Sequence, residues 1–233
     1  INMEGADVEA VMRQPVLHAL HGCFSLGTVV GASIGIVLTA IDFPVAWHMA
    51  LVSLICFPLV FYFITKLSPD LGRHAPSAGT QGAGKTAGAA LYRDKTVLFI
   101  GLIVLGMAFA EGAANDWLPL LMVDEHGLDP AQGTLVYLGF ALAMTAGRFG
   151  GGVPLRKWGR KAVMRGSAIA GAIGLALVIF VDNPWVAGLA VVLWGIGASL
   201  GFPVAQSAAG DSGENADARV KLVAIVGYVA FLA

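Results

Sequence analysis

Long apolar runs separated by short polar breaks dominate the chain. Two partial runs lie at its ends, one finishing near residue 5 and one starting near residue 220. Between them the full or nearly full runs are at about residues 16–40, 45–66, 96–119, 132–153, 163–181 and 185–207. At about 1.5 Å per helical residue, each full run can cross about 30 Å of hydrocarbon. The pattern therefore predicts an all-α protein that crosses a membrane several times.

The two ends of the chain fall within apolar runs. The chain begins at Ile1 without a Met, and it stops inside "GYVAFLA". We expect it to be an internal segment of a longer polytopic protein. The composition agrees with a membrane protein, since 57% of the residues are hydrophobic and only 12% are charged. The net charge of -1 gives no indication of nucleic-acid binding.

Glycines and cations follow the same pattern of spans and loops. Glycine is abundant, with 31 residues, and "GIGASLGFP" places small residues at spacings that let helices approach closely in lipid. Lys and Arg occur in every second loop and are missing from the loops between them. The positive-inside rule then predicts that the cytoplasmic loops are 6–15, 67–95, 154–162 and 208–221.

The longest loop contains "GTQGAGKT", Gly79 to Thr86, which fits the P-loop pattern for nucleotide binding. A working P-loop joins a buried strand to a helix, and the preceding Pro, Gly, Ser and His residues predict no strand. We interpret residues 67–95 as a flexible cytoplasmic linker. No nucleotide, other cofactor or metal is expected.

The basic loop "GRFGGGVPLRKWGRKAVMR" resembles a loop signature of the major facilitator superfamily. The matching positions are Gly152, Lys157, Gly159, Arg160 and Lys161, whereas Arg156 stands at the acidic position of the signature and Pro154 at its Leu. The resemblance implies a gating role for this loop, in which its residues latch the inward face and release it on opening.

Four other stretches are similar to helices of the same superfamily, and in particular of its fucose-permease-like and uncharacterised inner-membrane members. They are "HALHGCFSLGTVVGA", "EGAANDWLPLLMVD", "GIGASLGFPVAQSAA" and "VAIVGYVAFLA". The resemblance implies twelve helices in two bundles, alternating access and a solute site between the bundles. It assigns residues 1–66 to the first bundle, 67–95 to the linker, and 96–233 to helices 7 to 11 of the second.

Glu111 is the ionisable residue that stands out within a span. It lies fourteen residues beyond Val97, about 21 Å along a helix. Asn115 lies one turn on, on the same face. Glu111 could exchange protons or bind solute, with Asn115 as a hydrogen-bond partner. The alternative is an interfacial acid near the helix end, with Asp116 in water and Trp117 as an anchor.

Other polar residues could line the same pathway. His18 and His21 share one face at the start of span 16–40, with Ser25 one turn beyond His21. They could relay protons or bind solute, or they could simply bond to neighbouring helices. Gln206 could line the cavity. Arg148 is interpreted as reaching toward headgroups, and it is not expected to pair with Glu111, because the two depths differ.

Together these features predict a secondary transporter, and not an enzyme, in the inner or plasma membrane. The predicted activity is proton-linked symport of a small polar solute, with a sugar as one candidate. Aromatic side chains that could stack a sugar are Phe24, Tyr137, Trp194 and Phe202. The alternatives are efflux of amphipathic compounds on the same fold, or a membrane sensor or scaffold that does not transport.

Overall fold

The computed structural model describes residues 8–9, 12–66, 94–211 and 216–232 of the chain. Most of the predicted linker, including the Gly79–Thr86 pattern, and the first partial run lie outside the described residues. The described part is helical and has no strand. Its elements are α2 (Leu17–Ala40), α3 (Val45–Ile64), α5 (Lys95–Asp124), α6 (Pro130–Gly150), α7 (Gly152–Phe180), α8 (Pro184–Ser199), α9 (Gly201–Gly210) and α10 (Ala216–Phe231).

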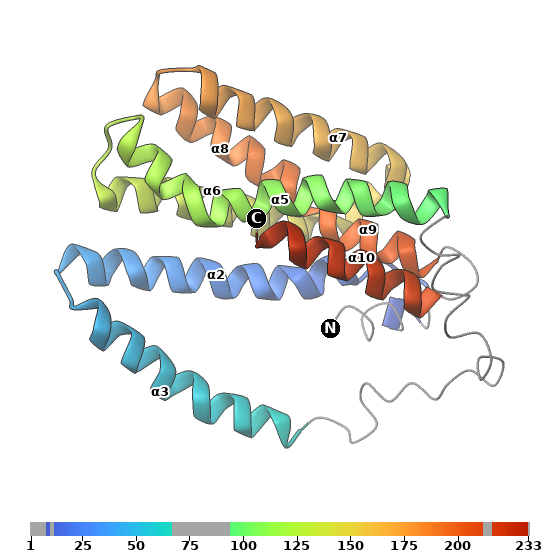
Figure 1. Cartoon of the computed structure of the whole chain (residues 1–233), viewed down its shortest axis with the longest axis horizontal. Coiled ribbons are helices and arrows are strands. Elements are labelled where there is room, and N and C mark those ends of the chain that lie inside the picture. The colour runs from blue at the N-terminus through green and yellow to red at the C-terminus, as the bar shows by residue number, and fades with distance from the viewer. Residues whose placement is uncertain (1–7, 10–11, 67–93, 212–215, 233) are drawn as a thin grey trace.

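The predicted all-α membrane fold is confirmed. Among the described residues, the segments long and apolar enough to cross a membrane are α2, α3, α5, α7, and α8 with α9. In Figure 1, α2 lies along α6, while α7 packs on α8 and α10 packs on α5. Helix α3 diverges from this group, and none of its residues is buried.

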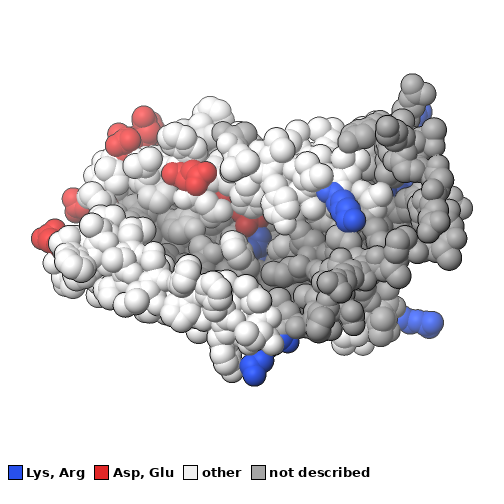
Figure 2. Space-filling view, turned by 60° about the horizontal axis from the view of Figure 1, so that its bottom comes forward, with Lys and Arg blue, Asp and Glu red and all other residues white. Residues whose placement is uncertain are grey.

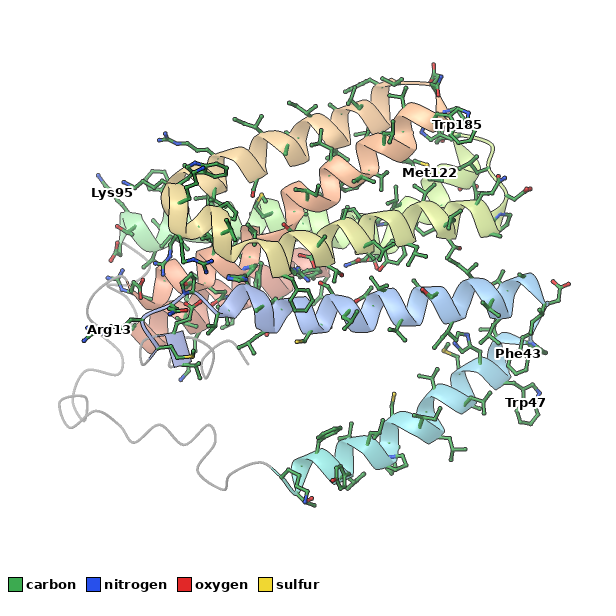
Figure 3. All side chains as sticks on the ribbon, turned by 180° about the vertical axis from the view of Figure 1, so that it is seen from behind. Arg13, Phe43, Trp47, Lys95, Met122 and Trp185 are labelled. Atoms are coloured by element: carbon green, nitrogen blue, oxygen red, sulfur yellow. The ribbon has the colours of Figure 1, made fainter. Side chains whose placement is uncertain are left out.

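Acidic and basic side chains lie toward opposite ends of the long axis of the bundle, and several aromatic side chains lie at one of these ends (Figure 2 and Figure 3). In the view of Figure 2, acidic residues gather toward one end and basic residues toward the other. Figure 3 shows Phe43, Trp47 and Trp185 at the end opposite Arg13 and Lys95. Aromatic side chains are common where helices meet the membrane interface. The distribution therefore agrees with loops that alternate between two membrane faces.

Helix α6 continues through Gly151 into the first part of α7, past residue 153, where the sequence predicts the end of the span. Gly151 has helical torsions, with φ -60° and ψ -24°, and the N–H of Leu155 donates to Gly151 O at 3.1 Å. The direction changes only at Gly159, whose φ of 75° suits a glycine. The predicted loop 154–162 is thus a continued helix, a single sharp turn and the start of the next helix.

A proline produces the second break that shapes the site, between α8 and α9. Pro203 has no N–H, so the carbonyl of Ser199, four residues earlier, loses its helical partner. The chain leaves regular helix at Leu200, with φ -104° and ψ -8°. The carbonyl of Ser199 is therefore open to a donor from another helix.

Asp94 stabilises the start of α5 by a helix-capping hydrogen bond and by an ion pair. Its side chain accepts the N–H of Thr96 at 2.8 Å and pairs with Arg219 of α10 at 2.6 Å. The backbone hydrogen bond from Thr96, with a smaller contribution from Arg219, holds the pKa of the Asp94 carboxyl below its ordinary value. Its stabilising effect is therefore present above the pKa of the unfolded chain and is lost as pH falls through the folded pKa.

Replacing Asp94 by Asn and by Ala separates these two roles. Asn still caps the helix and lacks only the charge, so D94A is expected to lower the thermal midpoint more than D94N. At acid pH the wild type should lose its advantage over D94N. Thermal unfolding of the purified protein at several pH values measures both effects. Equal midpoints for the two variants would show that the cap contributes nothing.

Candidate functional site

A buried ion pair lies at the centre of the helix group. Arg148 of α6 donates from Nη2 to both carboxylate oxygens of Glu111 on α5, at 2.7 Å and 2.8 Å. Each of the two residues is only 2% exposed. The interpretation of Arg148 as reaching for headgroups without pairing is therefore wrong, and so is that of Glu111 as an interfacial acid.

These two interpretations fail because the helix that contains Arg148 continues beyond α6 into the first part of α7. Because the helix runs on to Gly159, Arg148 lies eleven residues before the turn, about 16 Å into the bundle. Glu111 lies sixteen residues after Lys95 at the start of α5, about 24 Å along that helix. The two long side chains bridge the difference. The predicted span ended at residue 153, and this boundary placed Arg148 too near the cytoplasmic surface of the membrane.

Groups from two other helices complete the surroundings of the guanidinium. Nε donates to the Ser199 carbonyl that Pro203 leaves without a helical partner, at 3.1 Å. Nη1 donates to Ser25 Oγ and, at 3.5 Å, to the carbonyl of His21. Each of the three guanidinium nitrogens therefore has an acceptor. Arg148 joins α2 on one side to α5, α6 and α8 on the other.

Both predicted histidines contribute backbone or side-chain contacts around this group. His18 Nδ1 is 2.8 Å from the carbonyl of Arg148. Since a carbonyl only accepts, Nδ1 carries the hydrogen, and Nε2 is buried without a hydrogen-bond partner among the described residues. The ring of His21 meets the ring of Phe202 edge to face, with centroids 5.3 Å apart.

The remaining pathway candidates are divided between two places. Asn115 accepts a hydrogen bond from Tyr137 of α6 at 3.1 Å, one turn from Glu111. Gln206 is fully buried against α10. Its amide nitrogen donates to the carbonyl of Val220 at 3.3 Å, and its amide oxygen accepts the N–H of Ala224 at 3.0 Å. It therefore joins α9 to α10, apart from the contacts of Arg148.

The aromatic candidates are also divided. Phe24 is 68% exposed, whereas Trp194 is buried against Phe140. Phe202 and Tyr137 remain close to the polar group through His21 and Asn115. Of the four aromatic side chains, Phe202 and Tyr137 are the two that contact residues predicted for the pathway.

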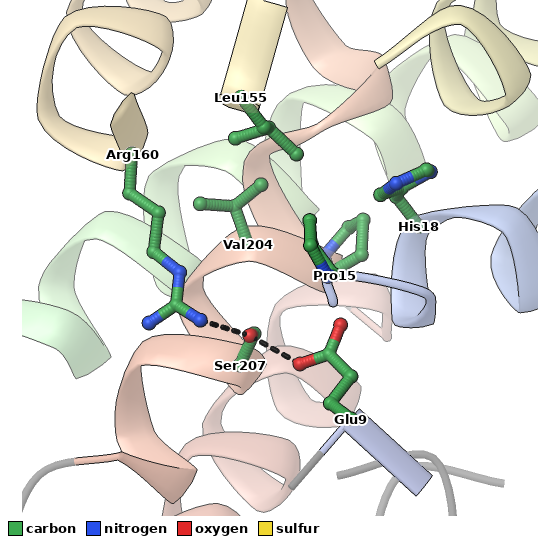
Figure 4. A pocket seen from close by; sticks show the side chains of 8 residues that line it. Glu9, Pro15, His18, Leu155, Arg160, Val204 and Ser207 are labelled. Atoms are coloured by element: carbon green, nitrogen blue, oxygen red, sulfur yellow. Dashed lines mark hydrogen bonds between the residues drawn. The ribbon is translucent and has the colours of Figure 1, made fainter. Parts of the chain in front are cut away.

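The basic turn takes part in a second polar cluster at the end of the bundle, shown in Figure 4. Arg160 donates to Asp211 Oδ2 and, at 2.8 Å, to Ser207 Oγ. Ser207 in turn donates to Glu9. The other oxygen of Glu9 accepts the N–H groups of Val16 and Leu17, both at 2.8 Å, and so caps the start of α2. This end cluster ties the segment before α2 to the turn and to α9.

The other residues of the loop signature differ in their environments. Gly152 is buried, and a Cβ at this position would lie 3.3 Å from His18 Nε2. Gly159 makes the turn, while Lys157 and Lys161 are exposed. Sequence reasoning missed Glu9, Ser207 and Asp211 altogether. Lone acids and a serine near span ends carry no pattern that marks them as partners of Arg160.

The fold and the two polar clusters describe a polytopic helical membrane protein with charge buried at the contact between helices. The chain belongs to the major facilitator superfamily, whose family model matches residues 16–233. This confirms the resemblance seen in the sequence. The fucose-permease-like subgroup stays a prediction.

Three curated relatives are similar to the chain. An uncharacterised MFS-type transporter of Yersinia pestis is 29% identical over 237 residues, covering 100% of this chain and 58% of its own length. An uncharacterised transporter of Sinorhizobium fredii is 27% identical over 238 residues, covering 98% and 59%. A cis,cis-muconate transport protein of Acinetobacter baylyi is 24% identical over 178 residues, covering 74% and 43%.

The chain thus spans about three fifths of the length of the first two relatives. No solved structure matches the chain.

Proposed function

We propose that this chain is part of a secondary transporter that moves a small polar solute across the cell membrane by alternating access, linked to proton movement. The observation that carries the proposal is the buried Arg148–Glu111 pair, in which Arg148 of α6 contacts residues of α2, α5 and α8. A charge inside a membrane is costly, and intramembrane ionisable residues commonly mark transport pathways. The resemblance favours a sugar as solute, while one relative is named for cis,cis-muconate transport.

Glu111 is the proton-binding group in this proposal. When Glu111 takes up a proton it loses the charge that holds Arg148, and the pair weakens. Arg148 also donates to Ser25 on α2, so the pair lies at the contact between the two proposed bundles, residues 1–66 and 96–233. His18, His21 and Asn115 border this group and belong to the proposed pathway.

The end cluster closes the cytoplasmic side in the same proposal. Arg160, Ser207 and Glu9 link α7, α9 and the segment before α2. Separation of α2 from α9 requires these contacts to break, as expected of a latch in alternating access. The positive-inside rule predicts the same cytoplasmic face for the basic turn and for the linker 67–95.

Proton movement triggered by solute tests the proposal. The full-length protein is placed in proteoliposomes with a trapped pH dye, and sugars and other small polar solutes are added in turn. Wild type is expected to move protons with at least one solute, and E111Q is expected to lose this movement. D116N, which alters an exposed acid on the same helix, is the matched control and should retain it.

The other outcomes are equally informative. Movement that survives E111Q would keep the transporter and remove Glu111 from the proton pathway. No movement with any solute would favour efflux of amphipathic compounds or a sensor that does not transport.

Removal of Arg160 should open the cytoplasmic end of the bundle. R160A loses both the Asp211 and the Ser207 contact, so a Cys placed at Val204 beside the end cluster should react several-fold faster with a membrane-impermeant maleimide. The measurement uses a cysteine-free background and inverted vesicles. K161A, which removes the exposed neighbouring cation, is the control. Equal labelling rates for the two variants would rule out the latch.

A further inference from the structure

We propose that the solute carries a carboxylate group, which replaces Glu111 on the guanidinium of Arg148 when Glu111 takes up a proton. This inference rests on the proposed function and names the class of solute. It differs from the sugar that the resemblance favours, and it assigns Arg148 as the residue that binds the solute. Three features of the ion pair support it.

The first feature is the charge balance. A guanidinium is a cation in proteins, and the side chain of Arg148 is only 2% exposed. Among the described residues, Glu111 is the acid that pairs with it. A buried guanidinium without a counter-ion is strongly unfavourable in a membrane. Once Glu111 is neutral, another anion must therefore take its place, and the hydroxyl groups of a sugar carry no charge.

The second feature is the geometry of the contact. The Nη2 edge of Arg148 meets two oxygens of one carboxylate, at 2.7 Å and 2.8 Å. A carboxylate on a solute has the same two oxygens at the same spacing, so it can repeat this contact. Proton and solute would then enter together without a change in the buried charge.

The third feature is that the other contacts of Arg148 are neutral. Nε is held by the Ser199 carbonyl, and Nη1 is held by Ser25 Oγ. These groups keep their hydrogen bonds when Glu111 is neutralised, so the guanidinium stays in place with its Nη2 edge ready for a new anion. Such preorganisation favours binding, because little freedom is lost when the solute arrives.

Groups beside the pair can hold the rest of the solute. Asn115 lies one turn beyond Glu111, and the hydroxyl of Tyr137 bonds to it at 3.1 Å. Both side chains are partly exposed, and both can exchange this bond for one to a solute. They supply hydrogen bonds without adding charge, so the carboxylate remains the group that Arg148 selects.

Binding to the purified full-length protein in detergent tests the inference without transport. The probes are acetate, succinate and benzoate, with glucose as the neutral solute and chloride matched in every sample. In wild type, carboxylate affinity should rise as pH falls, by up to tenfold per pH unit where Glu111 is ionised in the free protein. Glucose binding should not change in this way. Carboxylate binding that is absent, or independent of pH, would overturn the inference.

The E111Q variant gives the sharper comparison, because it leaves Arg148 without its counter-ion at every pH. E111Q should bind a carboxylate at least tenfold more tightly than wild type at pH 8, and without the dependence on pH. The double variant E111Q/R148M should lose this binding. Unchanged affinity in E111Q, or binding retained in the double variant, would show that the pair is structural only. If E111Q does not fold, the pH series on wild type still decides.

Proteoliposomes separate failure of the inference from failure of the proposed function. Proton movement with a carboxylate and not with glucose supports both. Movement with glucose alone overturns the inference and leaves the transporter. No movement with any probe, together with carboxylate binding that E111Q strengthens, would remove proton-linked transport and keep the anion site.

Discussion

Replacement of Arg148 by Met is expected to destabilise the folded protein by about 3–5 kcal/mol, because it leaves Glu111 buried without its partner. The same change leaves the Ser199 carbonyl without a donor, since Pro203 supplies none. E111Q should also destabilise, by leaving a buried guanidinium unpaired. Thermal or chemical unfolding of the purified protein in detergent measures both variants.

The double variant R148M/E111Q separates the pair from its surroundings. With both charges gone, no unpaired ion remains, so the loss should be at least about 2 kcal/mol smaller than the sum of the two single losses. The control is D116N, which changes an exposed acid on α5 and should alter the midpoint little. If the two single losses simply add, the ion pair makes no net contribution.

Replacement of Gly174 by Ala should have the second largest effect. A Cβ at this position of α7 would lie 2.5 Å from the N of Trp194 and 2.7 Å from the O of Ala190, both backbone atoms of α8. Backbone within a helix cannot move aside as a side chain can, so α7 and α8 must separate. We expect a loss of about 1–3 kcal/mol, measured by unfolding in detergent.

Gly166 on the same helix provides the control. A Cβ there would meet nothing within 4 Å, and Ala is favoured over Gly inside a helix by about 0.5–1 kcal/mol. G166A should therefore leave the stability unchanged or raise it. A similar loss in G166A and G174A would show that close packing of α7 on α8 is not the cause.

Five of the six predicted spans match described helices that are long and apolar enough to cross a membrane, because the bilayer imposes a strict length on apolar runs. Hydropathy failed at the end of α6, where "GGGVP" in 150–154 reads as a break. In the structure Gly151 keeps helical torsions, and the real turn is at Gly159. This shift explains why the sequence separated Arg148 from Glu111, although each was noticed as an ionisable residue inside a span.

The end cluster was beyond prediction for a different reason. Arg160 and Gly159 belong to a recognisable signature, but Glu9 and Ser207 are 198 residues apart. Only the packing of the segment before α2 against α9 brings them together. The Ser199 carbonyl is an intermediate case. Pro203 marks it as lacking a helical partner, and the sequence does not say which helix supplies the donor.

The position of the ion pair also bears on how the chain enters the membrane during synthesis. A charged Arg near the middle of a helix raises the cost of insertion by about 2.5–3.5 kcal/mol, and α6 is not among the described helices apolar enough to cross by themselves. Glu111 precedes Arg148 in the chain, and only residues 125–129 separate α5 from α6. The two helices are therefore suited to insertion as one hairpin, in which α5 supplies the anion that allows α6 to follow.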